Sequence, residues 1–259
     1  MVRYRYGHPN GFAEFLSFLS SVPKAEFAKV TRSTVPLLAW WADSRRVEKL
    51  RKLLHFGDRL EECFEYPVAA SCPKCTVKGK GKSSFTDVMM QTVAETVAIE
   101  AKYTEKLYPT IKRWAGSPVE GNKQLVLDHW MKCCIGTSQK WDDYKDLVYQ
   151  MVHRTASACV QAAERKTAPH VVLLLFVRHD SASKHVDTYV NAAGQLSKVL
   201  DRPEPIGFHV VRVETKEGEW LERVKRETAE QCADALRDAI GSQRPLFTFE
   251  DPELVYSKP

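Results

Sequence analysis

Two acidic side chains and one lysine stand on neighbouring strand-like segments. Asp87 lies in the segment 85–91, and Glu100 and Lys102 lie in the segment 96–103. Side chains alternate between the two faces of a strand, so Glu100 and Lys102 share one face. The opposite face is apolar and carries Val97, Ile99, Ala101 and Tyr103.

A hairpin that turns near residues 93–94 would place Asp87 directly across from Glu100. Directly opposed side chains have Cβ atoms about 5 Å apart, and two like charges there are destabilising unless a cation lies between them. We therefore expect a divalent cation, Mg²⁺ or Mn²⁺, between the two carboxylates. The alternative is a solvated sheet face with ordinary charges.

Such a site has the chemistry of phosphodiester hydrolysis. Hard cations prefer carboxylate oxygens, water and substrate phosphate, and a bound metal acidifies a water while neutralising charge on the phosphodiester. An ammonium such as that of Lys102 can orient or activate the attacking water, or stabilise the pentavalent intermediate.

The elements that must position these residues alternate in type along the chain. The predicted strands are 60–70, 85–91, 96–103, 170–177 and 206–214. The predicted helices are 12–19, 44–55, 122–135, 142–165, 184–200 and 218–240. This order predicts an α/β fold. We expect an N-terminal helical segment, 1–57, packed on a catalytic domain, 58–259, that ends in a helical extension, all within one structural domain.

The composition indicates a globular chain. It has 259 residues, 44% of them hydrophobic, and a formal net charge of +5. This weakly basic balance permits a polyanionic partner without requiring one. The absence of a long apolar run or of a signal-like start predicts a cytoplasmic protein with no membrane partner. The seven cysteines are an odd number in a long chain, and we expect reduced thiols.

Two further polar groups favour a phosphate-bearing substrate. Lys78, Lys80 and Lys82 alternate with glycines and precede Ser83, which predicts a nucleic-acid-binding loop. In the helix 142–165, four polar residues recur on one face: Gln150, Arg154, Ser157 and Gln161. The guanidinium of Arg154 has the geometry to hold a phosphate, although a partly buried structural stripe is an equal alternative.

Asp87 stands in the stretch Thr86-Asp87-Val88, and twelve residues separate it from Glu100 in the stretch Ile99-Glu100-Ala101-Lys102. This pattern resembles the PD-(D/E)XK, or restriction-endonuclease-like, nuclease superfamily. Thr86 stands where the superfamily motif commonly has proline. The stretches STVPLLAWW, GKSSFTDVMM, IEAKYTE and YQMVHRTASAC also resemble a group of uncharacterised bacterial proteins described as restriction endonucleases.

The resemblance implies an αβββαβ core with a mixed central sheet and a DNA-cleaving, metal-dependent activity. It implies a further acidic metal ligand on the preceding helix or first strand, for which Glu48 and Glu65 are the candidates. It also implies that Gln150 and Arg154 support the metal site.

Other functions remain open on the sequence alone. A catalytically inactive nucleic-acid-binding module would keep the charge pattern, and an RNA-directed nuclease would share the site. A homodimer is possible, and no small-molecule cofactor is expected. Cys72 and Cys75 have the spacing of half a zinc site, but a convincing second pair of ligands is missing.

Overall fold

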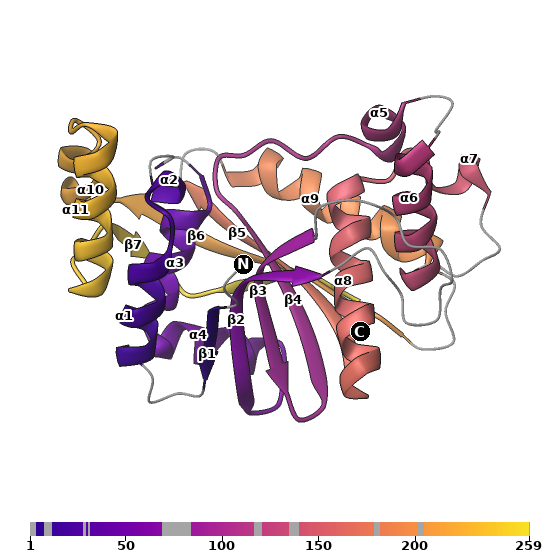
Figure 1. Ribbon diagram of the computed structural model, residues 1–259, viewed down its shortest axis with the longest axis horizontal. Helices are drawn as coiled ribbons and strands as arrows, with labels where there is room; N and C mark the ends of the chain where they lie inside the picture. Colours follow the sequence, from indigo (N-terminus) through magenta and orange to yellow (C-terminus); the bar gives the residue numbers. More distant parts are fainter. Residues whose placement is uncertain are drawn as a thin grey trace.

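A mixed β-sheet forms the centre of the protein (Figure 1). The computed structural model describes residues 4–7, 12–27, 30, 32–68, 84–116, 121–134, 140–178, 182–200 and 205–258. Within these residues, the eight strands follow the order β1-β2-β3-β4-β5-β6-β7, and β8 also pairs with β6. Their bounds are β1 Tyr4–Gly7, β2 Arg59–Val68, β3 Ser84–Thr92, β4 Glu95–Lys102, β5 Ala168–Arg178, β6 Gly207–Glu217, β7 Phe247–Phe249 and β8 Glu253–Lys258.

The strand directions divide the sheet into antiparallel and parallel parts. Strands β1 to β4 are antiparallel neighbours, whereas β4, β5 and β6 run parallel to one another. Strands β7 and β8 return antiparallel to β6. A helix leads into β2, and four helices lie between β4 and β5, the last of which leads into β5, so the predicted αβββαβ order and the α/β class are confirmed.

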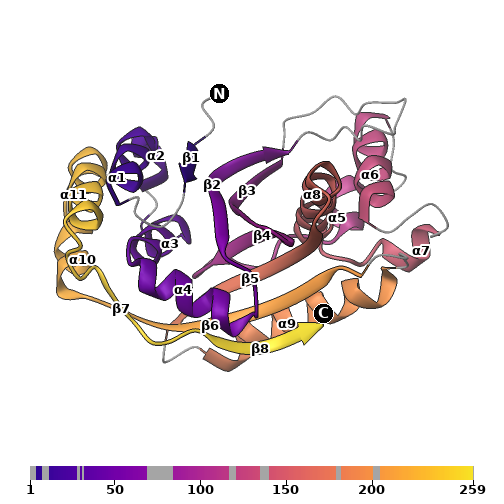
Figure 2. The same cartoon turned by 90° about the horizontal axis from the view of Figure 1, so that it is seen from below.

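Helices cover both faces of the sheet (Figure 2). On one face lie α5 Ile111–Ala115, α6 Gly121–Cys134, α7 Trp141–Tyr144, α8 Tyr149–Arg165 and α9 Ala182–Val199. On the other lie α1 Phe12–Ser21, α2 Lys24–Phe27, α3 Thr34–Trp41, α4 Ser44–Leu53, α10 Glu219–Val224 and α11 Ala229–Gly241. Each face buries its own apolar cluster, because every strand presents alternate side chains to the two sides.

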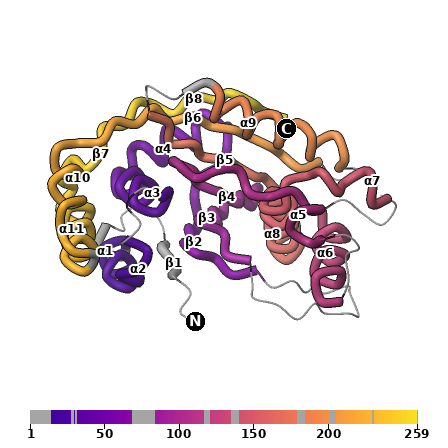
Figure 3. The backbone as a smooth tube through the Cα atoms, turned by 90° about the horizontal axis from the view of Figure 1, so that it is seen from above, coloured from indigo at the N-terminus to yellow at the C-terminus, as the bar shows by residue number. Residues whose placement is uncertain are grey.

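Helices from the two ends of the chain lie side by side (Figure 3). Lys24 on α2 contacts Asp234 on α11 at 2.7 Å, and Arg237 donates to the main-chain oxygens of Leu19 and Val22. The helices of the segment 1–57 share one apolar core with the strands. This segment also supplies the edge strand β1, which the sequence analysis did not predict.

Two predicted helices are wrong in their extent. The helix predicted at 142–165 is divided into α7 and α8, because the residue before α8, Val148, pairs with Thr110 in an extended bridge. The helix predicted at 218–240 is divided into α10 and α11, because the side chain of Thr228 caps the start of α11 by accepting from the Gln231 amide. The strands β7 and β8 follow where only a helical extension was expected.

Two further findings concern the length of the helices and the cysteines. None of the helices in the described ranges combines the length and apolar character that a bilayer span requires. Five cysteines fall within the described residues, and all five are buried: Cys63, Cys133, Cys134, Cys159 and Cys232. Cys72 and Cys75 lie outside the described residues.

The β3–β4 hairpin has the predicted register. Val88 pairs with Ile99, and the pairing continues to Gln91 and Thr96 before the turn. The apolar face of β4 is also confirmed, because Ile99 and Ala101 are fully buried against the N-terminal helices. Glu100 and Lys102 consequently face α8.

Enlarging Ala101 tests this assignment of faces. We expect Ala101→Leu to lower the free energy of unfolding by about 1–3 kcal/mol, because the buried site has no room for added methylenes. Ala94→Leu, in the exposed turn of the same hairpin, should stay within about 0.5 kcal/mol of wild type. Urea denaturation measures both, and an equally small change in the two variants would contradict the assignment.

Candidate active site

The strands β3 and β4 separate at the point where the acidic residues stand. Their pairing ends at Val88 and Ile99. One residue beyond it, Asp87 uses its Oδ2 atom to accept the amide of Ala101 at 2.8 Å. The half-buried carboxylate of Asp87 therefore replaces a main-chain hydrogen-bond partner of β4. It lies where the two strands separate, a point that we call the fork.

An irregularity in β2 accompanies this fork. A two-residue period would put Phe64 and Tyr66 on one face, yet Phe64 packs with the N-terminal helices and the Tyr66 hydroxyl donates to Gln161 on α8. Glu65, between them, has a φ of 48°, which is unfavourable for a residue other than glycine. The ladder pairs the neighbours of Glu65 with the neighbours of Asp87, so both strands change face here.

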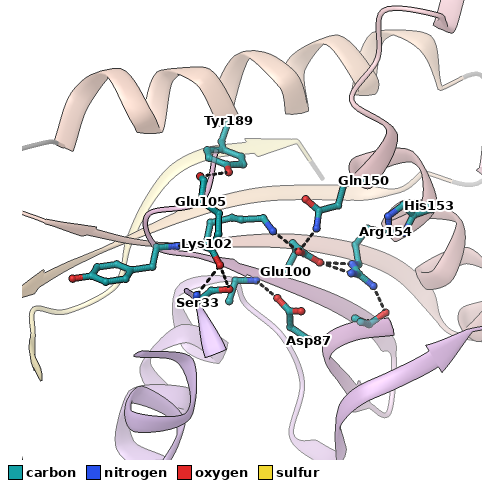
Figure 4. Close-up of polar contacts among 12 residues, drawn as sticks. Ser33, Asp87, Glu100, Lys102, Glu105, Gln150, His153, Arg154 and Tyr189 are labelled. Carbon is teal, nitrogen blue, oxygen red and sulfur yellow. Dashed lines mark hydrogen bonds and ion pairs between the residues drawn. The ribbon is translucent and has the colours of Figure 1, made fainter. Parts of the chain in front are cut away.

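The carboxylate of Glu100 is the centre of a buried ionic cluster (Figure 4). Its Oε1 accepts from Lys102 Nζ at 2.7 Å and from Gln150 Nε2 at 2.5 Å. Its Oε2 accepts from Arg154 Nε at 2.7 Å and also contacts the Arg154 Nη2 atom. Glu100 is 3% exposed and Arg154 2%. The predicted residues Glu100, Lys102, Gln150 and Arg154 are thus in direct contact.

The charges in this cluster are fixed by one another. Burial alone would raise the pKa of Glu100, but Arg154 and Lys102 outweigh it and hold the pKa below its usual value. Burial alone would lower the pKa of Lys102, but Glu100 and Asp87 outweigh it and raise the pKa. At neutral pH Glu100 is an anion and Lys102 an ammonium, so Lys102 is a positive charge and not a base.

Helix α8 fixes the site from its own buried face. Besides Glu100, Arg154 binds the Thr86 hydroxyl at 2.7 Å and so connects α8 to β3. The adjacent His153 lies 2.7 Å from the Ser84 hydroxyl, at the start of β3. Burial lowers the pKa of His153 to about 3, and this neutral imidazole adds no charge to the cluster.

A second group of carboxylates lies on the other side of the fork. Glu65 and Asp87 line a cavity of about 40 Å³ together with Glu26 from α2. Burial, followed by the charge of Glu100, raises the pKa of Asp87 well above its usual value. Burial, followed by the charge of Glu26, raises the pKa of Glu65 to about 7, although water at this exposed residue screens part of the effect.

These two groups differ in their fit to a divalent cation. Burial is the main cause of the raised pKa values of Asp87 and Glu65, and a cation in the neighbouring cavity would stabilise the charged forms of both carboxylates. Both oxygens of Glu100 are already bound by side chains, so Glu100 fits as a ligand only if Lys102 or Gln150 releases Oε1. In the described part of the chain, no three His, Cys, Asp or Glu side chains are spaced to hold a metal ion.

The remaining predicted site residues lie elsewhere. Glu48 stands on α4, where both of its oxygens bind Arg51, and no contact in the described residues joins it to Asp87 or Glu100. Of the two candidates for the upstream acidic residue, the structure brings only Glu65 to the fork. The predicted nucleic-acid-binding residues are outside the described part of the chain: Lys78, Lys80, Lys82 and Ser83.

Two acidic residues near the site were missed. Glu26 lines the same cavity as Asp87, but it follows no motif and reaches the cavity only through tertiary packing. Glu105 binds the amide and hydroxyl of Ser33 at 2.7 and 2.8 Å and the amide of Tyr103 at 2.8 Å. It thereby joins the start of α3 to the end of β4. The sequence signal that could have identified Glu105 was its position three residues after Lys102.

Comparisons with known proteins identify a family but not an activity. A model of a protein family described as a domain of unknown function, DUF6946, matches residues 10–216. The matched range includes both carboxylate groups and helix α8. No curated protein matches the chain, and no solved structure matches it. Because the match covers most of its length, the chain belongs to the DUF6946 family.

Proposed function

We propose that the protein is a metal-dependent nuclease that hydrolyses phosphodiester bonds in DNA. The observation that carries the proposal is the strand fork, where Asp87 accepts the Ala101 amide and where Lys102, Gln150 and Arg154 bind Glu100. The αβββαβ element order and the resemblance of the motif to PD-(D/E)XK nucleases support it. Restriction or phage defence is a role consistent with this activity.

Each residue of the site has a separate role in the proposed reaction. Asp87 and Glu65 would hold Mg²⁺ or Mn²⁺, with Glu100 as a further ligand, and the cation would activate water and neutralise charge on the phosphate. Lys102 is held as an ammonium by Glu100, so its role is to stabilise negative charge at the reacting phosphate. Gln150 and Arg154 position the Glu100 carboxylate from α8.

Arg154 is a positioning residue in this account. Its guanidinium is 2% exposed and bound to Glu100 and Thr86, so it is not available to a phosphate. The sequence expectation that Arg154 holds phosphate directly is replaced by a role through Glu100. We propose phosphate contact instead for Lys102, should a bound phosphate displace it from Glu100, and for Lys78, Lys80 and Lys82.

One observation favours a different function. Glu100 is fully bound by Lys102, Gln150 and Arg154, as a purely structural ion cluster would be. A catalytically inactive nucleic-acid-binding module would have this arrangement. It would bind DNA without metal-dependent cleavage, whereas an RNA-directed nuclease would cleave RNA and spare DNA.

Replacing Lys102 separates these functions. We expect Lys102→Ala to lower DNA cleavage about 10²–10⁴-fold, because a positioned positive charge near the phosphate is lost. Lys106→Ala removes an exposed lysine four residues later and should cleave as wild type does. The measurement is cleavage of plasmid, single-stranded DNA and RNA with Mg²⁺ or Mn²⁺, on proteins of matched thermal stability. Wild-type protein that cleaves none of these substrates, or cleaves without metal, would contradict the nuclease.

The pH dependence of stability tests the acidic cavity separately. Glu65 has a pKa near 7 in the folded protein against 4.5 for the free side chain, so the folded state binds its proton more tightly. This contribution to stability is present below 4.5 and is lost as pH rises through about 7. We expect wild type to lose stability relative to Glu65→Gln over that window, and we expect Mg²⁺ to reverse the loss.

Thermal unfolding as a function of pH, with and without Mg²⁺, measures this difference. Glu227→Gln, which removes an exposed carboxylate between α10 and α11, is the control and should follow wild type at every pH. If Glu65→Gln also follows wild type throughout, the carboxylate of Glu65 lacks the raised pKa and is not part of a cation site.

A further inference from the structure

A cleft lies away from the carboxylates and shares no lining residue with their cavity. It has a volume of about 550 Å³, which lies in the range of small-molecule sites. It opens between the α3–α4 junction and the segment that joins α11 to β7. Its lining includes three apolar residues that are at least partly exposed, Ala42, Pro245 and Phe249, and three charged ones, Asp43, Arg46 and Arg244.

The charged residues of the cleft are unequal in sign. Three arginines line it against a single carboxylate, that of Asp43. Asp43 binds Arg45 through both of its oxygens, at 3.0 and 2.9 Å. Neither Arg46 nor Arg244 has an equally close carboxylate among the residues that line the cleft.

Arg46 is a half-buried cation with long contacts. Its side chain is 31% exposed, its Nε lies 3.8 Å from Asp43, and its Nη1 is 3.4 Å from the Ala39 oxygen. Its guanidinium lies 4.8 Å from the ring centroid of Phe249, which fixes the group without using its donors. Burial lowers the pKa of Arg46, as expected for a charge that is incompletely compensated.

Arg244 repeats this arrangement on the opposite wall. Its guanidinium lies 4.8 Å from the ring centroid of Trp220, and its Nη2 is 3.6 Å from the Asp238 carboxylate. Two guanidinium groups, each stacked on an aromatic ring, thus line one cleft. Planar groups with several fixed donors are suited to a phosphate, which they can bind through two parallel hydrogen bonds.

We propose that this cleft binds the phosphate of a nucleotide-sized ligand, with Arg46 and Arg244 as the phosphate-binding residues. The accessible apolar side chains of the lining, Ala42, Pro245 and Phe249, would receive the less polar remainder of the ligand. The phosphate could belong to a free mononucleotide or to an end of a nucleic acid strand, and both present the same group. The site is independent of the proposed nuclease activity, since it shares no residue with the carboxylate groups.

The test is calorimetric titration of the full chain with adenosine 5′-monophosphate, adenosine, and a short DNA duplex with or without 5′-phosphates. Arg46→Gln and Arg244→Gln remove the two guanidinium groups. Arg223→Gln is the matched control, because Arg223 also lies over the Trp220 ring, at 5.4 Å, but does not line the cleft. The side chain of Arg244 is 43% exposed, so its variant remains informative if Arg46→Gln fails to fold.

We expect adenosine 5′-monophosphate to bind and adenosine not to bind. Each cleft variant should weaken binding about 10–100-fold, the range for a charge-assisted hydrogen bond, while Arg223→Gln binds as wild type does. Binding only of the 5′-phosphorylated duplex, weakened equally by the cleft variants, assigns the phosphate to a strand end. Absence of binding by both phosphate ligands, or equal affinity in wild type and the cleft variants, would overturn the proposal.

Discussion

The ion cluster around Glu100 is the interaction on which the arrangement of the site depends. A carboxylate that is 3% exposed carries a large desolvation cost, which only close cations and hydrogen bonds offset. Arg154 and Gln150 supply these from α8, and Lys102 supplies them from β4 itself. Removing one partner of such a buried pair typically costs about 3–5 kcal/mol, because the remaining charge stays buried. The cluster thereby fixes α8 on the sheet.

The same cluster accounts for the unequal charge balance at the fork. Arg154 and Lys102 bind Glu100 and hold its pKa below the usual value, whereas burial raises the pKa values of Asp87 and Glu65. A folded chain with a surplus of negative charge in one small cavity is destabilised there unless a cation or a proton binds. Functional sites commonly contain such groups. The proposed cation would therefore stabilise the charged forms of Asp87 and Glu65 in this cavity.

The sequence predicted those features that depend on short-range patterns. Alternation along β4 placed Glu100 and Ala101 on opposite faces, the turn fixed the β3–β4 register, and helical spacing put Gln150 and Arg154 on one side of α8. It left open whether Arg154 is part of a buried structural stripe or open to phosphate, and it did not predict the contact of Arg154 with Glu100. That contact depends on how closely α8 packs on the sheet, which no local pattern records.

The other failures have the same physical origin. The contribution of Glu26 and the choice of Glu65 over Glu48 arise from the packing of α2 and from a positive φ at Glu65. The edge strand β1 and the return strands β7 and β8 are short, and their pairing with distant parts of the chain stabilises them. The division of two predicted helices followed from a cap at Thr228 and a bridge at Val148.

The location of bound Mn²⁺ tests the account most directly, because Mn²⁺ scatters X-rays anomalously and can be placed in a crystal without reference to activity. We expect one strong anomalous peak at the fork, in contact with Asp87 and Glu65, and no peak in Asp87→Asn. Crystals saturated with Mn²⁺ that show no peak there, with Glu100 still bound by Lys102, Gln150 and Arg154, would contradict it.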